Sequence, residues 1–124
     1  MPAACSGGAG IQADLKTFSA HGVFGMSVIV SVVAENTSRV IDMQNILPDM
    51  IAKQIDAVFE DITVDAVKIG MLSDGDCMRA VAEKLKQYKL NNVVIDPVMY
   101  AKNGCPLMQR QAIETLIKNI IPLA

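Results

Sequence analysis

Short runs of β-branched residues alternate along this chain with longer amphipathic segments, and this alternation limits the fold more than any other feature. The apolar runs cover residues 26–34, 66–69 and 93–95. A strand that is apolar along nearly its whole length is typical of a parallel sheet covered on both faces. Parallel strands need crossover connections, which are usually helices. The sequence therefore predicts an α/β fold, with a mostly parallel sheet flanked by helices.

Four segments have the three-to-four-residue spacing of apolar side chains that is typical of helices. The first follows a glycine-rich loop at residues 6–10 and should end at Gly22. The second begins at Pro48, the third begins near Asp74, and the fourth follows a loop at residues 100–106. These helices fall between the apolar runs, as expected of βαβ units.

The glycine-rich loop has no predicted strand before it, although loops of this type normally follow a strand. No strand is predicted after the fourth helix either. A short edge strand is expected at residues 39–41. The pattern therefore predicts one continuous segment over residues 1–124, with a sheet that is open at both ends of the sequence.

Composition excludes several classes of protein. The chain has 124 residues, of which 52% are hydrophobic and 19% charged, a composition that supports a core and argues against disorder. The net charge of −2 leaves no positive excess for binding nucleic acid. No apolar run approaches the roughly 18 residues of a membrane helix. The three cysteines lie far apart without a C-x-x-C pair, which indicates reduced thiols and a cytoplasmic location.

Three carboxylates stand where a ligand site is expected. Ligands of open parallel sheets bind beyond the carboxyl ends of the strands. Glu35 and Asp96 each follow an apolar run, and Asp14 lies one helical turn after the glycine-rich loop. Each also has a plain structural explanation. Asp14 fits a solvated helical carboxylate, Glu35 a cap of the following loop, and Asp96 a turn residue held extended by the next proline.

The basic residues carry less information. Lys68 lies inside a predicted strand and Lys102 in a loop, and a solvated lysine explains either position better than a phosphate contact. His21 is the only histidine, and its place at a helix end fits a partner for the helix dipole. The loop at residues 6–10 lacks the Walker A pattern, and no residues have the spacing of metal ligands.

Four stretches, taken in order, carry a family resemblance. Residues 6–17 read Ser-Gly-Gly-Ala-Gly-Ile-Gln-Ala-Asp-Leu-Lys-Thr, and residues 35–37 read Glu-Asn-Thr. Residues 67–72 read Val-Lys-Ile-Gly-Met-Leu, and residues 96–99 read Asp-Pro-Val-Met before an Ala-Lys pair. Together they resemble the hydroxymethylpyrimidine/phosphomethylpyrimidine kinases, which are thiamine-biosynthetic members of the ribokinase-like superfamily.

The resemblance implies a reaction and a site. It implies ATP- and Mg²⁺-dependent transfer of phosphate to 4-amino-5-hydroxymethyl-2-methylpyrimidine, and then to its monophosphate. Asp14 resembles a polar contact to the pyrimidine, and Glu35 stands where many members have a glutamine that bonds the aminopyrimidine. Asp96, with Lys102, resembles the side of the site that faces metal and phosphate. The apolar walls of the pyrimidine pocket would be Ala9, Val33, Met71 and Val98.

The chain also departs from the family pattern. The family begins with a strand and a Gly-x-Asp segment, whereas here Ala4 stands at the aspartate position. The resemblance covers the substrate-side first half of a kinase domain. The ATP side and the catalytic residue belong to the second half, so we expect no activity from this chain alone.

Two other functions stay open at this stage. A pyridoxine- or pyridoxal-type kinase of the same superfamily phosphorylates a similar heterocycle, and Glu35 is the discriminating position. The other possibility is a non-catalytic fragment, which binds a pyrimidine or a partner or is only structural. A homodimer is a further expectation, because exposed sheet edges favour association.

Overall fold

Two small sheets form the centre of the protein in a computed structural model, which describes residues 1–100, 104 and 106–124. The first sheet has three strands in the order β1 (Pro2–Ala4), β2 (Ser31–Glu35) and β3 (Val40–Asn45). The second pairs β4 (Val67–Ile69) with β5 (Val93–Ile95) in parallel. The α/β class is confirmed. A single open sheet was expected, and two are observed because β1 and β4 share no ladder.

The expectation that no strand precedes the glycine-rich loop was wrong. Pro2, Ala3 and Ala4 pair in parallel with Ser31, Val32 and Val33 of β2. Pairing continues before the strand, where the Val30 N–H donates to the Met1 carbonyl at 3.0 Å. A Pro-Ala-Ala run has no β-forming pattern of its own, so this strand depends on its neighbour rather than on local propensity.

The strand expected at residues 26–34 begins at Ser31 instead. Before it, the backbone N–H and carbonyl of Ile29 are both bonded by the Gln54 side-chain amide, at 2.9 Å each. That amide takes the place of a neighbouring strand. The edge strand expected at residues 39–41 is longer, and β3 runs antiparallel to β2 with a register shift between Ala34 and Glu35.

The four expected helices are present, with different lengths. They are α1 (Gly10–Ala20), α2 (Pro48–Phe59), α3 (Gly75–Tyr88) and α4 (Ala112–Thr115). The last continues as a wider π-helical turn over Leu116–Ile120 and a tight 3-10 turn over Ile121–Leu123. None of the helices in the described ranges is both long and apolar enough to span a membrane.

The helix ends follow the local rules that the sequence suggested. The Asp74 carboxylate accepts a hydrogen bond from the Cys77 N–H at 2.8 Å and caps α3. Gly22 has a φ of +71° just after α1, the left-handed conformation that glycine adopts without strain.

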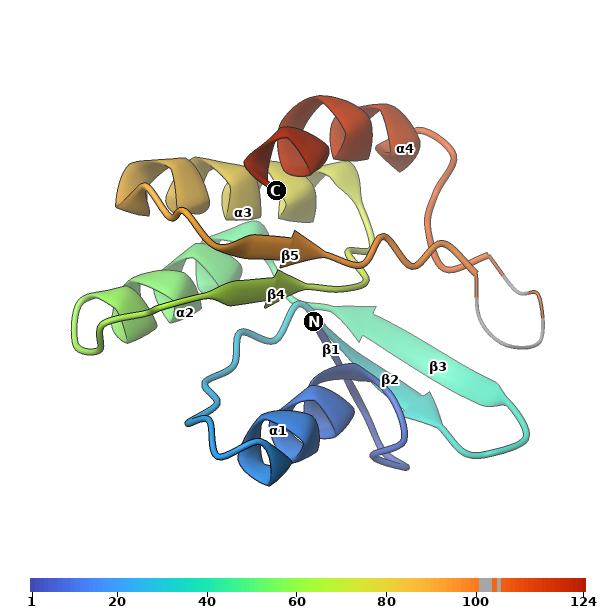
Figure 1. Cartoon of the computed structure of the whole chain (residues 1–124). Coiled ribbons are helices and arrows are strands. Elements are labelled where there is room, and N and C mark those ends of the chain that lie inside the picture. The colour runs from blue at the N-terminus through green and yellow to red at the C-terminus, as the bar shows by residue number, and fades with distance from the viewer. Residues whose placement is uncertain (101–103, 105) are drawn as a thin grey trace.

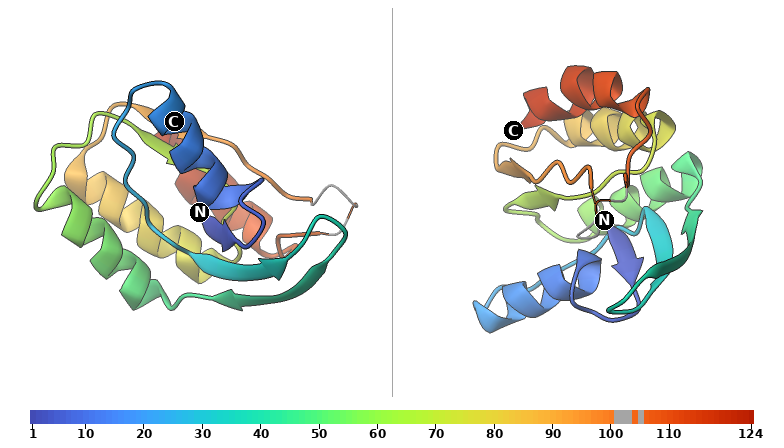
Figure 2. Two further views of the ribbon diagram at one scale, coloured as in Figure 1. Left: turned by 90° about the horizontal axis from the view of Figure 1, so that it is seen from below. Right: turned by 90° about the vertical axis from the view of Figure 1, so that its right-hand side faces the viewer.

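The main core lies between the β4–β5 sheet and the helices that cover it. Figure 1 shows α3 and the C-terminal helix above this sheet, and α1 on the far side beside β1 and β2. The views in Figure 2 agree with that division. Ile51, Met78 and Ile120 are fully buried in this core. Ala4 and Ile11 are also buried, but they lie outside the main cluster. The α1–β1 end therefore packs as a smaller unit of its own.

Candidate functional site

One ion-pair cluster joins three elements that lie far apart in the sequence. The Lys68 ammonium on β4 lies 3.1 and 3.2 Å from the two carboxylate oxygens of Asp14 on α1. The same nitrogen lies 3.9 Å from a carboxylate oxygen of Asp96, which follows β5. The Asp14–Lys68 pair is largely shielded from solvent, whereas the Asp96 side chain is 60% exposed. The structure therefore brings Asp14 and Asp96 to the same cation.

Lys68 itself was misjudged from the sequence. A solvated lysine was the favoured explanation, but its side chain is only 25% exposed and is paired on both sides. A lysine between Val67 and Ile69, in the middle of a short apolar strand, is a signal that could have found this role. Lysine is rarely buried without a partner.

Glu35 is the last residue of β2, at the point where the register with β3 shifts. The following turn is capped by Asn36, whose side-chain oxygen accepts from the Ser38 and Arg39 N–H groups at 2.9 and 3.0 Å. Capping by Glu35, one of the two explanations from the sequence, is therefore not needed. Within the described ranges, the half-buried Glu35 carboxylate has no hydrogen-bond or ion-pair partner.

The four residues expected as apolar walls differ in exposure. Val33 and Met71 are buried, Val98 is half-buried, and Ala9 is exposed at the start of α1. Val33 is opposite Ala4 in the β1–β2 ladder. Met71 and Val98 follow β4 and β5, and so lie beyond the carboxyl ends of these two strands. Lys102 lies outside the described residues.

The glycine-rich loop is held by its own contacts. Gly10 has a φ of +67°, and a β-carbon there would lie 2.5 Å from the Pro2 carbonyl oxygen. The Lys16 ammonium donates to the Gly7 carbonyl at 3.1 Å. The Gln12 side chain accepts from the Ala4 N–H at 3.0 Å. Gly10 is thus required by the tight approach of the loop to β1.

The described residues do not form a metal site by themselves. No group of three carboxylate, histidine or cysteine side chains gathers in this part of the chain. Asp96 supplies one exposed carboxylate, and the Lys68 ammonium lies 3.9 Å from it. A single carboxylate binds Mg²⁺ only together with other ligands, such as phosphate oxygens.

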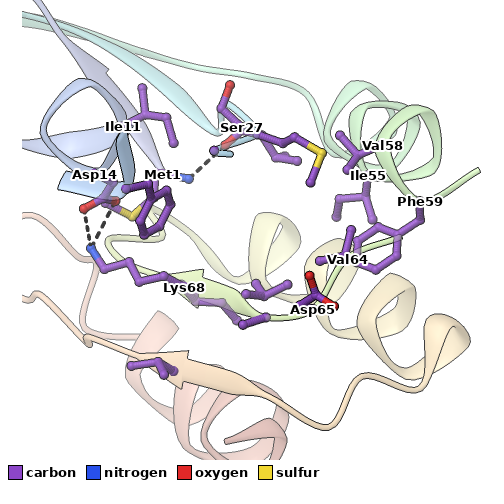
Figure 3. A pocket seen from close by; sticks show the side chains of 18 of the residues that line it. Met1, Ile11, Asp14, Ser27, Ile55, Val58, Phe59, Val64, Asp65 and Lys68 are labelled. Carbon is purple, nitrogen blue, oxygen red and sulfur yellow. Dashed lines mark hydrogen bonds and ion pairs between the residues drawn. The ribbon is translucent and has the colours of Figure 1, made fainter. Parts of the chain in front are cut away.

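A large apolar cavity lies beside the ion-pair cluster and is separate from the expected pyrimidine walls. Its volume is about 580 Å³, and it lies between α1, α2 and β4 (Figure 3). Met1, Phe18, Val58 and Phe59 are among its lining residues. Of the residues expected to contact the substrate, only Asp14 lines it. Figure 3 shows Asp14 and Lys68 joined at one end of this cavity.

The N-terminal ammonium lies at the same end. It donates to the Val28 carbonyl at 3.1 Å. Burial lowers the pKa of this ammonium to about 6, although the Asp14 carboxylate acts in the opposite direction. By contrast, burial raises the pKa of the Cys77 thiol to about 12, which makes this thiol unreactive at neutral pH.

Comparison with known proteins identifies the family. Residues 4–124 match the family model described as phosphomethylpyrimidine kinase. The chain belongs to the phosphomethylpyrimidine kinase family. It is 53% identical over 117 residues to the hydroxymethylpyrimidine/phosphomethylpyrimidine kinase of Escherichia coli K12. It is 48% identical to a bifunctional thiamine biosynthesis protein of Geobacter sulfurreducens.

Solved structures agree with the family and with the ribokinase-like fold. A phosphomethylpyrimidine kinase from Clostridium difficile 630 superposes with a TM-score of 0.93 at 51% identity and covers 99% of this chain. A pyridoxal kinase from Bacillus subtilis superposes with a TM-score of 0.81 at 35% identity.

The chain spans about half the length of the relatives that it matches. The match with the E. coli kinase includes 94% of this chain but only 44% of that kinase. The share is 54% for the C. difficile structure and 46% for the pyridoxal kinase. This chain therefore corresponds to one part of the fold of these kinases.

Proposed function

We propose that this chain forms the acceptor-binding part of a kinase that phosphorylates 4-amino-5-hydroxymethyl-2-methylpyrimidine and then its monophosphate in thiamine biosynthesis. The observation that carries the proposal is the family match over residues 4–124. ATP is the phosphate donor implied by a kinase family, and Mg²⁺ would accompany it. Residues 1–124 act in this proposal as one substrate-side segment of the kinase domain.

The proposed contacts follow from the chemistry of the residues at the strand ends. Asp14 would bond a polar edge of the pyrimidine. Glu35, whose carboxylate has no partner within the described ranges, would accept a hydrogen bond from the exocyclic amino group. The walls would be Ala9, Val33, Met71 and Val98. Asp96 and Lys102 would face the phosphates and the metal.

The chain supplies binding and orientation rather than chemistry. Phosphoryl transfer requires a positioned acceptor, a positioned donor and groups that stabilise the moving charge. Most of the residues assigned here belong to the binding site of the acceptor. We therefore expect this chain alone to bind the pyrimidine without turnover.

A pyridoxal kinase is the second candidate, because pyridoxal kinases share this fold at lower identity. Glu35 separates the two possibilities. We expect Glu35→Gln, which keeps an acceptor oxygen, to retain pyrimidine binding, and Glu35→Ala to weaken it. Calorimetric titration of each variant with the aminopyrimidine and with pyridoxal makes this comparison.

Two results would contradict the proposal. Tighter binding of pyridoxal than of the aminopyrimidine would favour the second candidate, and no binding of either would favour a purely structural fragment. Phosphorylated product above a blank, on incubation with ATP and the pyrimidine, would show that the chain is active alone.

Location and assembly complete the proposal. The free thiols of Cys5 and Cys77 support a cytoplasmic location. All six residues of β3 are exposed, and this edge strand supports a homodimer. Sedimentation at increasing concentration tests the dimer, and a single monomeric species throughout would contradict it.

A further inference from the structure

We propose that Lys68 is a positioning residue, which holds Asp14 and Asp96 at a fixed spacing across the rim of the acceptor site. This inference rests on the proposed function, because the two carboxylates belong to its substrate side and its phosphate side. Lys68 would contact neither the pyrimidine nor the phosphates.

The geometry fits a bridge between elements rather than a surface ion pair. The ammonium lies within 3.2 Å of both oxygens of Asp14, so it bonds the carboxylate through both oxygens rather than through one. Lys68 is the central residue of β4, where Val67 and Ile69 on either side pair with β5. A side chain that starts from a rigid strand places its partner more accurately than one that starts from a loop.

Charge balance makes the bridge necessary. Asp14 is 19% exposed, so its carboxylate is only partly hydrated. Without the cation, the poorly solvated Asp14 carboxylate would have lost its paired charge and would share the rim with the exposed Asp96 carboxylate. The N-terminal ammonium also interacts with Asp14, but it loses its proton more easily than a lysine does. Lys68 is the cation that bonds both oxygens of Asp14.

The chain offers a matched control in a second bridging lysine. Lys84 on α3 lies 2.7 Å from Asp56 on α2, and the exposed fractions of the two pairs are similar, 22% and 27% against 25% and 19%. The Lys84 pair also joins two elements but lies away from the rim. Lys84→Met therefore removes a comparable ion pair without touching the candidate site.

The experiment compares Lys68→Met, Lys68→Arg and Lys84→Met with the unchanged chain. Affinity for the aminopyrimidine is measured by calorimetry, and stability by urea unfolding. We expect Lys68→Met to weaken binding about 10-fold or more, as for a lost hydrogen bond to a charged group. Lys68→Arg should restore most of the affinity because it keeps the charge. Lys84→Met should lower stability and leave the affinity unchanged.

Two outcomes would overturn the inference. One is wild-type affinity in Lys68→Met, and the other is an equal loss of affinity in Lys84→Met, which would indicate general destabilisation. If the unchanged chain does not bind the pyrimidine, the proposed function fails. The ion-pair bridge is then tested by the unfolding free energies of the variants alone. Asp14→Asn and Lys68→Met must then be non-additive in a double-mutant cycle, and additive losses would contradict the bridge.

Discussion

The hydroxyl of Ser31 is buried at the start of β2 and has no hydrogen-bond partner within the described ranges. A buried, unpaired hydroxyl costs about 1–3 kcal/mol of desolvation. We therefore expect Ser31→Ala to raise the free energy of unfolding by about 1 kcal/mol, measured by urea denaturation.

The control for this prediction is Ser73→Ala. Ser73 is as deeply buried, but its hydroxyl lies 3.5 Å from the Asp74 carboxylate and has a partner. This variant should not gain stability. A gain of equal size in both variants would mean that the missing partner at Ser31 is not the cause.

Single residues also show where sequence reasoning succeeds and fails. The positions of Asp14 and Asp96 near one rim could be anticipated, because strand ends and the position one turn into a helix are predictable from spacing. The place of Lys68 in a short apolar strand indicates that it needs a partner, but the sequence does not say which one. Asp14 and Lys68 are 54 residues apart, and their contact depends on how α1 lies against β4. The roles of all the expected site residues, Asp14 and Asp96 included, stay predictions.

At the scale of elements, two helix ends adopt the same left-handed backbone with different residues. Lys89 follows α3 with a φ of +51°, and Gly22 follows α1 with a φ of +71°. A side chain other than glycine is strained there by about 1 kcal/mol. We expect Lys89→Gly to raise the unfolding free energy and Gly22→Ala to lower it, each by up to about 1 kcal/mol.

Thermal and urea unfolding of the two variants check this pair. No atom lies within 4 Å of a β-carbon placed at Gly22, so a loss there would reflect backbone conformation and not a clash. If Gly22→Ala left stability unchanged, the strain argument would fail for both positions.

The elements differ in how well the sequence predicts them. The helices were predictable because their apolar spacing and capping residues are local signals. The strand β1 was not, since its three residues acquire strand geometry only from pairing with β2. The late start of β2 was missed for a similar reason, because the Gln54 side chain lies on α2 and replaces a strand that the local pattern favoured.

At the scale of the whole molecule, stability should depend on pH through the buried N-terminal ammonium. Its pKa is lowered from 8.0 to about 6 by burial, so the unfolded chain binds a proton more readily than the folded chain. The contribution of this ammonium to the free energy of unfolding therefore rises as the pH increases from about 6 to about 8. Below and above that range, its contribution does not change with pH. The expected change is about 2 kcal/mol.

Acetylation of the Met1 amine isolates this effect. The acetylated chain has no ammonium to bury, so its unfolding free energy should vary less over the same pH range than that of the unmodified chain. Parallel curves for the two forms would show that the ammonium is solvated in the folded protein.

The separate packing of the α1–β1 end has a consequence for motion. The main core draws on residues from Val30 onward, while Ala4 and Ile11 are buried outside it. Residues 1–22 should therefore open locally without global unfolding, and their amides should exchange with solvent faster than those of α3. Ala9 and Asp14 lie on this piece. An occupied acceptor site would then act as a latch, which slows exchange in α1 while leaving α3 unchanged.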